Sequence, residues 1–121
     1  MDDAESAHAI VLHIPTLKAL ITGDLVYNKV NLWLAEGRMA GWKSSLDILA
    51  KKYPKVEMLY TGHGANGGKE LLALNKSYID DFEAILKTAK TKAEAMEVMK
   101  AKHPDMALPI ISDIAFATKL K

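Results

Sequence analysis

An amphipathic helix pattern between two short apolar segments constrains the fold more than any other feature of this sequence. Residues 18–22 form a short and mainly apolar segment, and the side chains of residues 55–60 alternate in type, so we expect a strand at each place. Between them, apolar side chains recur at spacings of four, three and four residues, which predicts a helix that ends at Pro54. Because strands alternate with a helix here, we expect an α/β layer. The apolar face of this helix consists of Trp42, Leu46, Leu49 and Tyr53.

The first third of the chain adds two further predicted elements. Residues 8–14 (HAIVLHI) are apolar and β-branched, and Pro15-Thr16-Leu17 forms a tight connection to the strand at 18–22, so we expect a hairpin or two adjacent strands. Residues 28–36 predict a short helix, which the glycines at 37 and 41 end. Its apolar side would carry Val30, Trp33 and Leu34.

The rest of the chain has helical periodicity to its end. Thr91 and Glu94 form a capping-box pattern for a helix that ends near His103-Pro104, and Pro109 is placed to open the last helix. We therefore expect a single domain over 1–121, with a sheet and motif region at 1–66 and a helical extension at 67–121. The predicted inward residues are Leu71, Leu74, Tyr78, Phe82, Ile85 and Ala89 on the long helix and Ile110, Ile114 and Ala117 on the last.

Composition excludes several classes of function. With 16 basic and 15 acidic residues the formal net charge is +1, so no basic tail or stripe indicates a nucleic-acid partner. Charged residues and prolines interrupt the apolar stretches before the ~20 residues that a membrane span needs. The start MDDAESAH lacks the features of a signal peptide, so we expect a cytoplasmic protein if this is the natural start. Since the chain has no cysteine, any metal must bind His and carboxylate side chains.

Two predicted strand ends carry a polar residue beside glycine. Asp24 follows Gly23, and His63 lies between Gly62 and Gly64. Taken alone, Asp24 fits a turn or helix-capping carboxylate and His63 fits an ordinary loop histidine. However, strands of one sheet commonly end at the same edge, where ligands bind in open α/β folds. A carboxylate and an imidazole that meet there predict a metal site.

Both segments resemble known metal-binding motifs. IPTLKALITGDLVYN and VEMLYTGHG are similar to the third and fourth metal motifs of the metallo-β-lactamase superfamily, and the tail with IDDF, HPD and ALPII resembles the C-terminal extension of one hydrolase branch. This resemblance implies half of an αββα sandwich: a short mixed sheet with helices on one face, followed by a three-helix extension. It also implies two divalent metal ions, zinc first and otherwise iron or manganese. Asp24 would bridge both metals and His63 would bind the second.

One expected motif is absent from the sequence. The His-x-His-x-Asp-His motif of the superfamily, which supplies the ligands of the first metal, has no counterpart here. We therefore expect the C-terminal half of a metal-dependent hydrolase, inactive on its own. In the parent protein, a metal-activated hydroxide would attack an ester, lactone, thioester or amide bond of a small-molecule substrate. The alternative is a non-catalytic domain that forms a homodimer through an exposed sheet edge or face.

Three further residues are candidates for the pocket. Tyr27 and Asn28 follow Asp24 closely and could line the pocket or hydrogen-bond to the ligands, and His8 could lie near the site. The alternatives are packing for Tyr27, helix capping for Asn28 and an ordinary strand position for His8. Asn31 occupies a place where relatives often carry a histidine, which puts a substrate role for this position in doubt.

Overall fold

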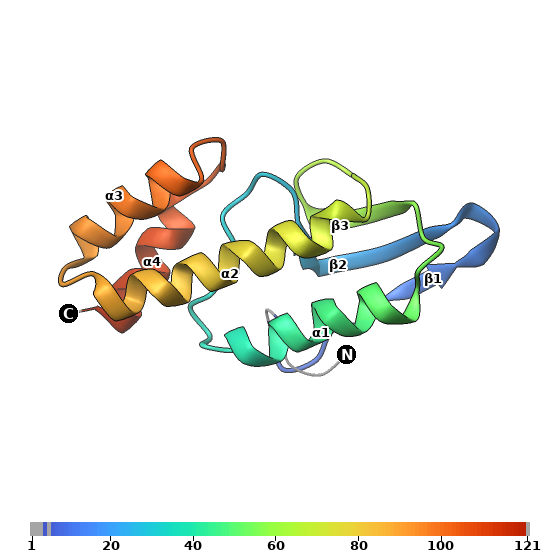
Figure 1. Cartoon of the computed structure of the whole chain (residues 1–121), viewed down its shortest axis with the longest axis horizontal. Coiled ribbons are helices and arrows are strands. Elements are labelled where there is room, and N and C mark those ends of the chain that lie inside the picture. The colour runs from blue at the N-terminus through green and yellow to red at the C-terminus, as the bar shows by residue number, and fades with distance from the viewer. Residues whose placement is uncertain (1–3, 5, 121) are drawn as a thin grey trace.

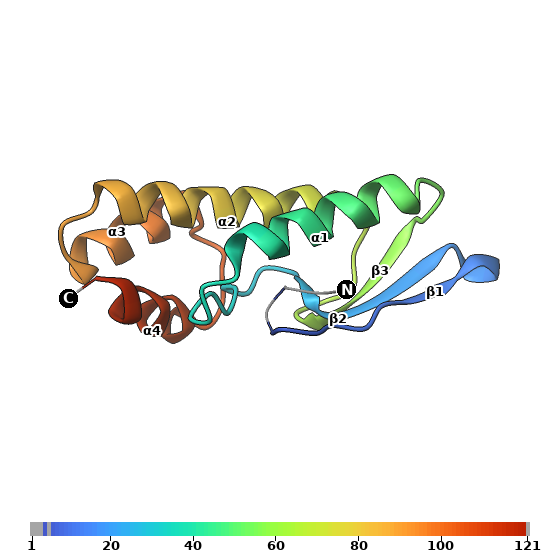
Figure 2. The same cartoon turned by 90° about the horizontal axis from the view of Figure 1, so that it is seen from below.

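A three-stranded sheet carries helices on one of its faces in the computed structural model, which describes residue 4 and residues 6–120 (Figure 1). Two helices cover the sheet, and the other two lie beyond its end (Figure 2). In chain order the elements are β1 (Leu12–Ile14), the 3-10 helix η1 (Pro15–Leu17), β2 (Ala19–Tyr27), α1 (Met39–Lys52), β3 (Met58–His63), α2 (Glu70–Thr88), α3 (Lys92–Lys102) and α4 (Pro109–Lys119).

The sheet is mixed, with the strand order β1-β2-β3. β1 and β2 form an antiparallel hairpin in which Leu12 lies opposite Ile21, whereas β2 and β3 are parallel and place Leu20 opposite Leu59. The parallel pairing follows from the connection through α1, since a helix must carry the chain back before β3 starts. The predicted short mixed sheet with helices on one face is confirmed.

The core lies between the sheet and the helices. Leu20 and Leu59 are fully buried under α1 and α2, and the buried Trp42 donates a hydrogen bond from Nε1 to the Leu25 carbonyl at 2.8 Å. At the far end of α2, Phe82 stacks on Phe116 of α4, with the ring centroids 4.5 Å apart. A single apolar core therefore continues from the sheet into the C-terminal helices.

The C-terminal helices begin and end close to the predicted positions. The Thr91 hydroxyl accepts a hydrogen bond from the Glu94 amide at 3.2 Å and caps α3. His103 is the C-cap residue of the same helix, and Pro109 occupies the first turn of α4. None of the helices in the described part of the chain combines the length and hydrophobicity that crossing a bilayer requires.

The predicted helix at 28–36 is wrong. This segment is irregular, because Lys29 adopts a left-handed conformation with φ of 56° that no helix continues. The backbone of Lys29 and Asn31 instead bonds Ala107 in the loop between α3 and α4, with N···O distances of 2.8 and 3.1 Å. A contact far along the chain thus replaces the local helical hydrogen bonds.

Both N-terminal strand boundaries also differ from the prediction. Only Leu12–Ile14 of the segment 8–14 forms a strand. β2 continues past Thr22-Gly23-Asp24 to Tyr27, so Asp24 lies inside the strand and not at its end. The pairing of β2 with β3 is irregular here, with register shifts on both sides of Gly23.

On two helices the buried face is rotated about the helix axis from the predicted one. On α4, Ile110, Ile114 and Ala117 are exposed, and the buried residues are Ser112, Ala115 and Phe116. On α2, Leu74 is exposed and its neighbour Asn75 is buried. Both helices turn a polar residue inward because that residue has a hydrogen-bond partner in the core.

Candidate functional site

Asp24 and His63 lie side by side at the β2–β3 pairing. Asp24 Oδ1 is 3.2 Å from His63 Nε2, and the two side chains are 53% and 41% exposed. A carboxylate oxygen and an imidazole nitrogen thus face solvent next to each other. The pair offers two donor atoms of the kinds that bind zinc, iron and manganese.

Glycine permits this close approach. A Cβ atom at Gly62 would lie 2.6 Å from the carbonyl carbon of Gly23 and 2.7 Å from the amide nitrogen of Asp24. No real Cβ tolerates such contacts with backbone atoms, so the two strands approach each other only because residue 62 has no side chain. Gly23 itself has a φ of 53°, in the left-handed region that favours glycine.

The loop after His63 is fixed by its neighbours. The Asn28 amide donates to the His63 carbonyl at 2.9 Å, and the Asn28 side chain donates to the Ala65 carbonyl at 2.9 Å. The Tyr27 ring packs against the His63 ring, with their centroids 4.6 Å apart. Tyr27 therefore lies against the His63 ring and Asn28 is bonded to the loop that follows, and none of the described helices begins at Asn28.

His8 shares a cavity with Asp24 but not with His63. It lines a cavity of about 180 Å³ together with Thr22, Gly23 and Asp24. Within the described residues, no group of three or more His, Asp or Glu side chains is arranged to hold a metal ion. A catalytic zinc site uses three protein ligands and an open position. The donor types of Asp24 and His63 fit such a site, but their number makes them only a part of one.

Comparison with solved structures gives the fold a family context. No protein-family model matches this sequence. A metallo-β-lactamase from Pontibacter korlensis matches 65% of this chain with a TM-score of 0.61 and 26% sequence identity. The DIM-1 metallo-β-lactamase matches 65% of the chain with a TM-score of 0.60 and 22% identity. This chain carries part of the metallo-β-lactamase fold. It spans 38% of the length of each of these two proteins.

This partial metallo-β-lactamase fold confirms the resemblance inferred from the sequence. Two polar residues that the sequence periodicity did not predict to be buried also lie inside this fold. The first is Asn75 on α2, which is 3% exposed. Its Oδ1 accepts the Tyr27 amide and its Nδ2 donates to the Tyr27 carbonyl, both at 2.8 Å. The Asn75 side chain thus pairs with the last residue of β2 as a neighbouring strand would. Asn75 lies at helical spacing from Leu71 and Tyr78, and this spacing was the sequence signal that it faces the core.

The second position is Asn31, which lies at the centre of a buried hydrogen-bond network. Asn31 Oδ1 accepts from the Tyr78 hydroxyl at 2.7 Å and from Ser112 Oγ at 2.9 Å. Its Nδ2 donates to the Ala107 carbonyl at 2.9 Å. The network joins the segment after β2 to α2 and α4. Asn31 thus connects three parts of this metallo-β-lactamase-like chain.

The Tyr78 hydroxyl should make stability sensitive to alkaline pH. Burial raises the pKa of Tyr78 to about 12 from its ordinary value of 10.0, and hydrogen bonding with Ser112 and the Leu32 backbone lowers it in part. Because the folded-state pKa is the higher one, the neutral phenol stabilises the fold below pH 10 and this contribution is lost as the pH rises toward 12. Tyr78→Phe should therefore weaken the loss of stability between pH 10 and 12.

Urea unfolding at several alkaline pH values measures this effect. Tyr60→Phe is the matched control, because Tyr60 is 39% exposed. If Tyr60→Phe flattens the alkaline profile as much as Tyr78→Phe does, burial of Tyr78 is not the cause.

Proposed function

We propose that this chain supplies the Asp24 and His63 ligands of a metal-dependent hydrolase of the metallo-β-lactamase kind. The observation that carries the proposal is the 3.2 Å contact between Asp24 Oδ1 and His63 Nε2 at an exposed position of a partial metallo-β-lactamase fold. The remaining ligands would come from residues that this chain does not contain. A bound divalent cation, zinc first and otherwise iron or manganese, supplies a Lewis acid for the hydrolysis of an ester, lactone, thioester or amide.

The residues around the pair prepare it for this role. The Asp24 carboxylate and the His63 Nε2 atom are the donor atoms. The hydrogen bonds of Asn28 to the His63 and Ala65 carbonyls hold the loop, so the imidazole needs little reorganisation when a cation binds. Thr61 Oγ1 adds a bond to the Gly64 carbonyl at 3.2 Å.

The open face of the sheet supports a role as one half of a larger unit. Leu12, Ile21 and Tyr60 lie opposite one another across the three strands and are all exposed. This row lies on the face away from α1 and α2, and an exposed apolar patch of this kind marks an interaction surface. We assign it to contact with the rest of the hydrolase, so the isolated chain should not turn over substrate.

Zinc binding tests the ligand assignment. In an NMR titration of the chain with ZnCl₂, the His63 ring signals should shift first. Asp24→Asn and His63→Gln should each weaken zinc affinity roughly tenfold or more, because each removes one of two protein ligands. His13→Gln is the matched control, since the His13 ring packs on Tyr53 at 4.4 Å. Zinc shifts confined to His13 or His103, or equal losses in the control, would contradict the assignment.

The hydrolase assignment needs a separate test on the longest product of the gene. We expect bound metal and turnover in a panel of ester, lactone, thioester and lactam substrates. A product with neither would exclude the hydrolase.

The same apolar row favours a second candidate function, a non-catalytic domain that self-associates. Pairing with another copy would cover Leu12, Ile21 and Tyr60 equally well. Light scattering over a range of concentrations distinguishes the two candidates. A dimer that Ile21→Lys dissociates would favour self-association, whereas a dilute monomer would exclude it.

A further inference from the structure

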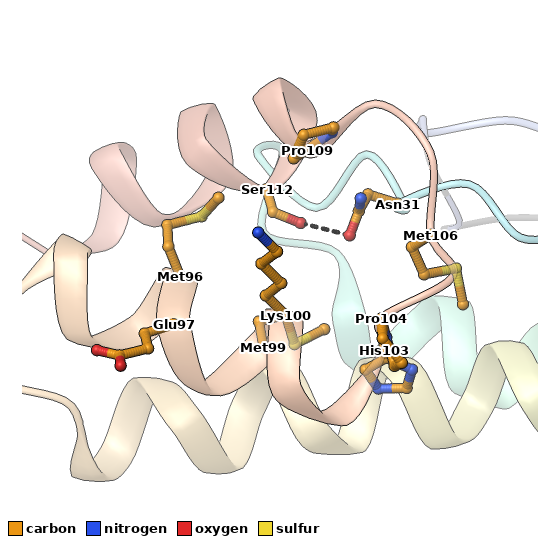
Figure 3. Close-up of a pocket in the computed structure, with 10 residues that line it drawn as sticks. All are labelled: Asn31, Met96, Glu97, Met99, Lys100, His103, Pro104, Met106, Pro109 and Ser112. Carbon is orange, nitrogen blue, oxygen red and sulfur yellow. Dashed lines mark hydrogen bonds between the residues drawn. The ribbon is translucent and has the colours of Figure 1, made fainter.

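A second cavity lies between the C-terminal helices, away from Asp24 and His63. It has a volume of about 450 Å³, within the range of about 300–1,000 Å³ that is common for small-molecule sites. α3, α4, the loop between them and the segment after β2 form its walls (Figure 3). Its apolar lining consists of Met96, Met99, Met106, Pro104 and Pro109.

The apolar lining is adaptable on one side. Met96 and Met99 come from α3, and Met106 comes from the loop that follows it. Unbranched thioether side chains change rotamer easily and fit ligands of irregular shape. These methionines suit a flexible hydrocarbon body better than a polar ligand.

One cation reaches into this apolar space. Lys100 extends from α3 across the cavity toward Ser112 on α4 (Figure 3). Among the described residues, no carboxylate lies within ion-pair distance of Lys100. Glu97 also borders the cavity, but its carboxylate turns away from the Lys100 amine (Figure 3). The cavity therefore presents one unpaired ammonium group beside an apolar surface.

The polar part of the lining is held in place by hydrogen bonds. Ser112 and Asn31 border the cavity and belong to the buried network with Tyr78, in which the Tyr78 and Ser112 hydroxyl oxygens are 2.8 Å apart. His103 is fixed by a 2.9 Å contact from Nε2 to Asp81 Oδ2 and by the Tyr78 ring at 4.9 Å. A wall that is already ordered costs little entropy when a ligand binds.

We propose that this cavity binds a small amphipathic carboxylate, with its hydrocarbon body on the three methionines and its carboxylate on Lys100 Nζ. A single lysine matches a single negative charge. Pro109, the first residue of α4, also lines the cavity, and the dipole of α4 favours an anion near this end of the helix. The proposal depends on neither a metal nor the hydrolase function, because Asp24 and His63 do not line this cavity.

Methionine-methyl NMR with octanoate as the probe tests this site. In chain labelled with ¹³C at the methionine methyls, octanoate should shift Met96, Met99 and Met106 and leave Met39 and Met58 unchanged. Lys100→Met keeps most of the side-chain length but removes the charge, and it should weaken octanoate binding about tenfold, the loss expected for one charge-assisted hydrogen bond. Lys87→Met, on the exposed end of α2, is the matched control and should bind octanoate as the wild type does.

Probes of different charge distinguish a site that recognises a carboxylate from nonspecific binding to an apolar surface. Octanol and octylamine have the same chain length as octanoate, and both should bind more weakly than octanoate does. The proposal fails if millimolar octanoate leaves the three cavity methyls unshifted, or if it shifts Met58 on the open sheet face equally. It also fails if octanol binds as tightly as octanoate or if Lys100→Met binds octanoate like the wild type.

Discussion

Replacing Asn75 with leucine is expected to lower the free energy of unfolding by about 3 kcal/mol. The Asn75 side chain satisfies both the amide and the carbonyl of Tyr27 at 2.8 Å, and it is itself buried. Leucine fills a similar volume but removes the hydrogen bonds that Asn75 makes to two buried backbone groups, each at a cost of about 1–3 kcal/mol. Since domains of this size are stable by only about 5–15 kcal/mol, the loss is a large fraction of the total.

Urea denaturation of Asn75→Leu measures this loss, and Asn66→Leu provides the matched control. Asn66 lies exposed in the loop between β3 and α2, so its substitution should change the free energy of unfolding by less than about 0.5 kcal/mol. A loss below about 1 kcal/mol in Asn75→Leu would mean that water or a shift of β2 satisfies the Tyr27 backbone.

Periodicity predicted the helices because their hydrogen bonds are local. α1 and α2 begin within a few residues of Trp42 and Leu71, the first residues of their predicted apolar faces. The Thr91 cap and Pro109 lie where helix-start rules place them. The general type of sheet also followed from the sequence, since the order of strands and helices permits few arrangements.

The errors occur where distant contacts decide the structure. The segment after β2 has the apolar spacing of a helix, but the backbone bonds of Lys29 and Asn31 to Ala107 replace that helix. Likewise, Ser112 and Asn75 turn inward against the simple apolar pattern because each finds a hydrogen-bond partner supplied by another element. A sequence pattern shows that a residue is polar, but it does not show that a partner lies across the core.

The proximity of Asp24 and His63 was predicted from the sequence, because both residues were expected at strand ends on one edge of a sheet. The two side chains do lie together, although β2 continues past Asp24. The sequence showed only that both residues lie beside glycines, whereas the structure gives Gly62 a specific role. The backbone of β2 occupies the space where a side chain of residue 62 would lie.

Gly62→Ala is therefore expected to destabilise the fold by about 3 kcal/mol and to separate Asp24 from His63. The new methyl would meet the backbone of Gly23 and Asp24 at 2.6–2.7 Å, and backbone atoms cannot rotate away as a side chain can. Overpacking of this kind costs about 1–3 kcal/mol and forces shifts of the surrounding strands. Urea unfolding measures the first effect, and displacement of the His63 ring signals in NMR spectra measures the second.

Gly23→Ala is the matched control because it tests the left-handed backbone conformation without a steric clash. A Cβ atom at Gly23 would meet no atom within 4 Å, so the cost there arises only from the φ of 53° and should be about 1 kcal/mol. The variant that loses more unfolding free energy shows whether the contact between Asp24 and His63 depends on the close approach of the strands at Gly62 or on the backbone conformation of Gly23. If Gly23→Ala is the more damaging variant, the left-handed turn and not the close packing of β2 on β3 holds Asp24 beside His63.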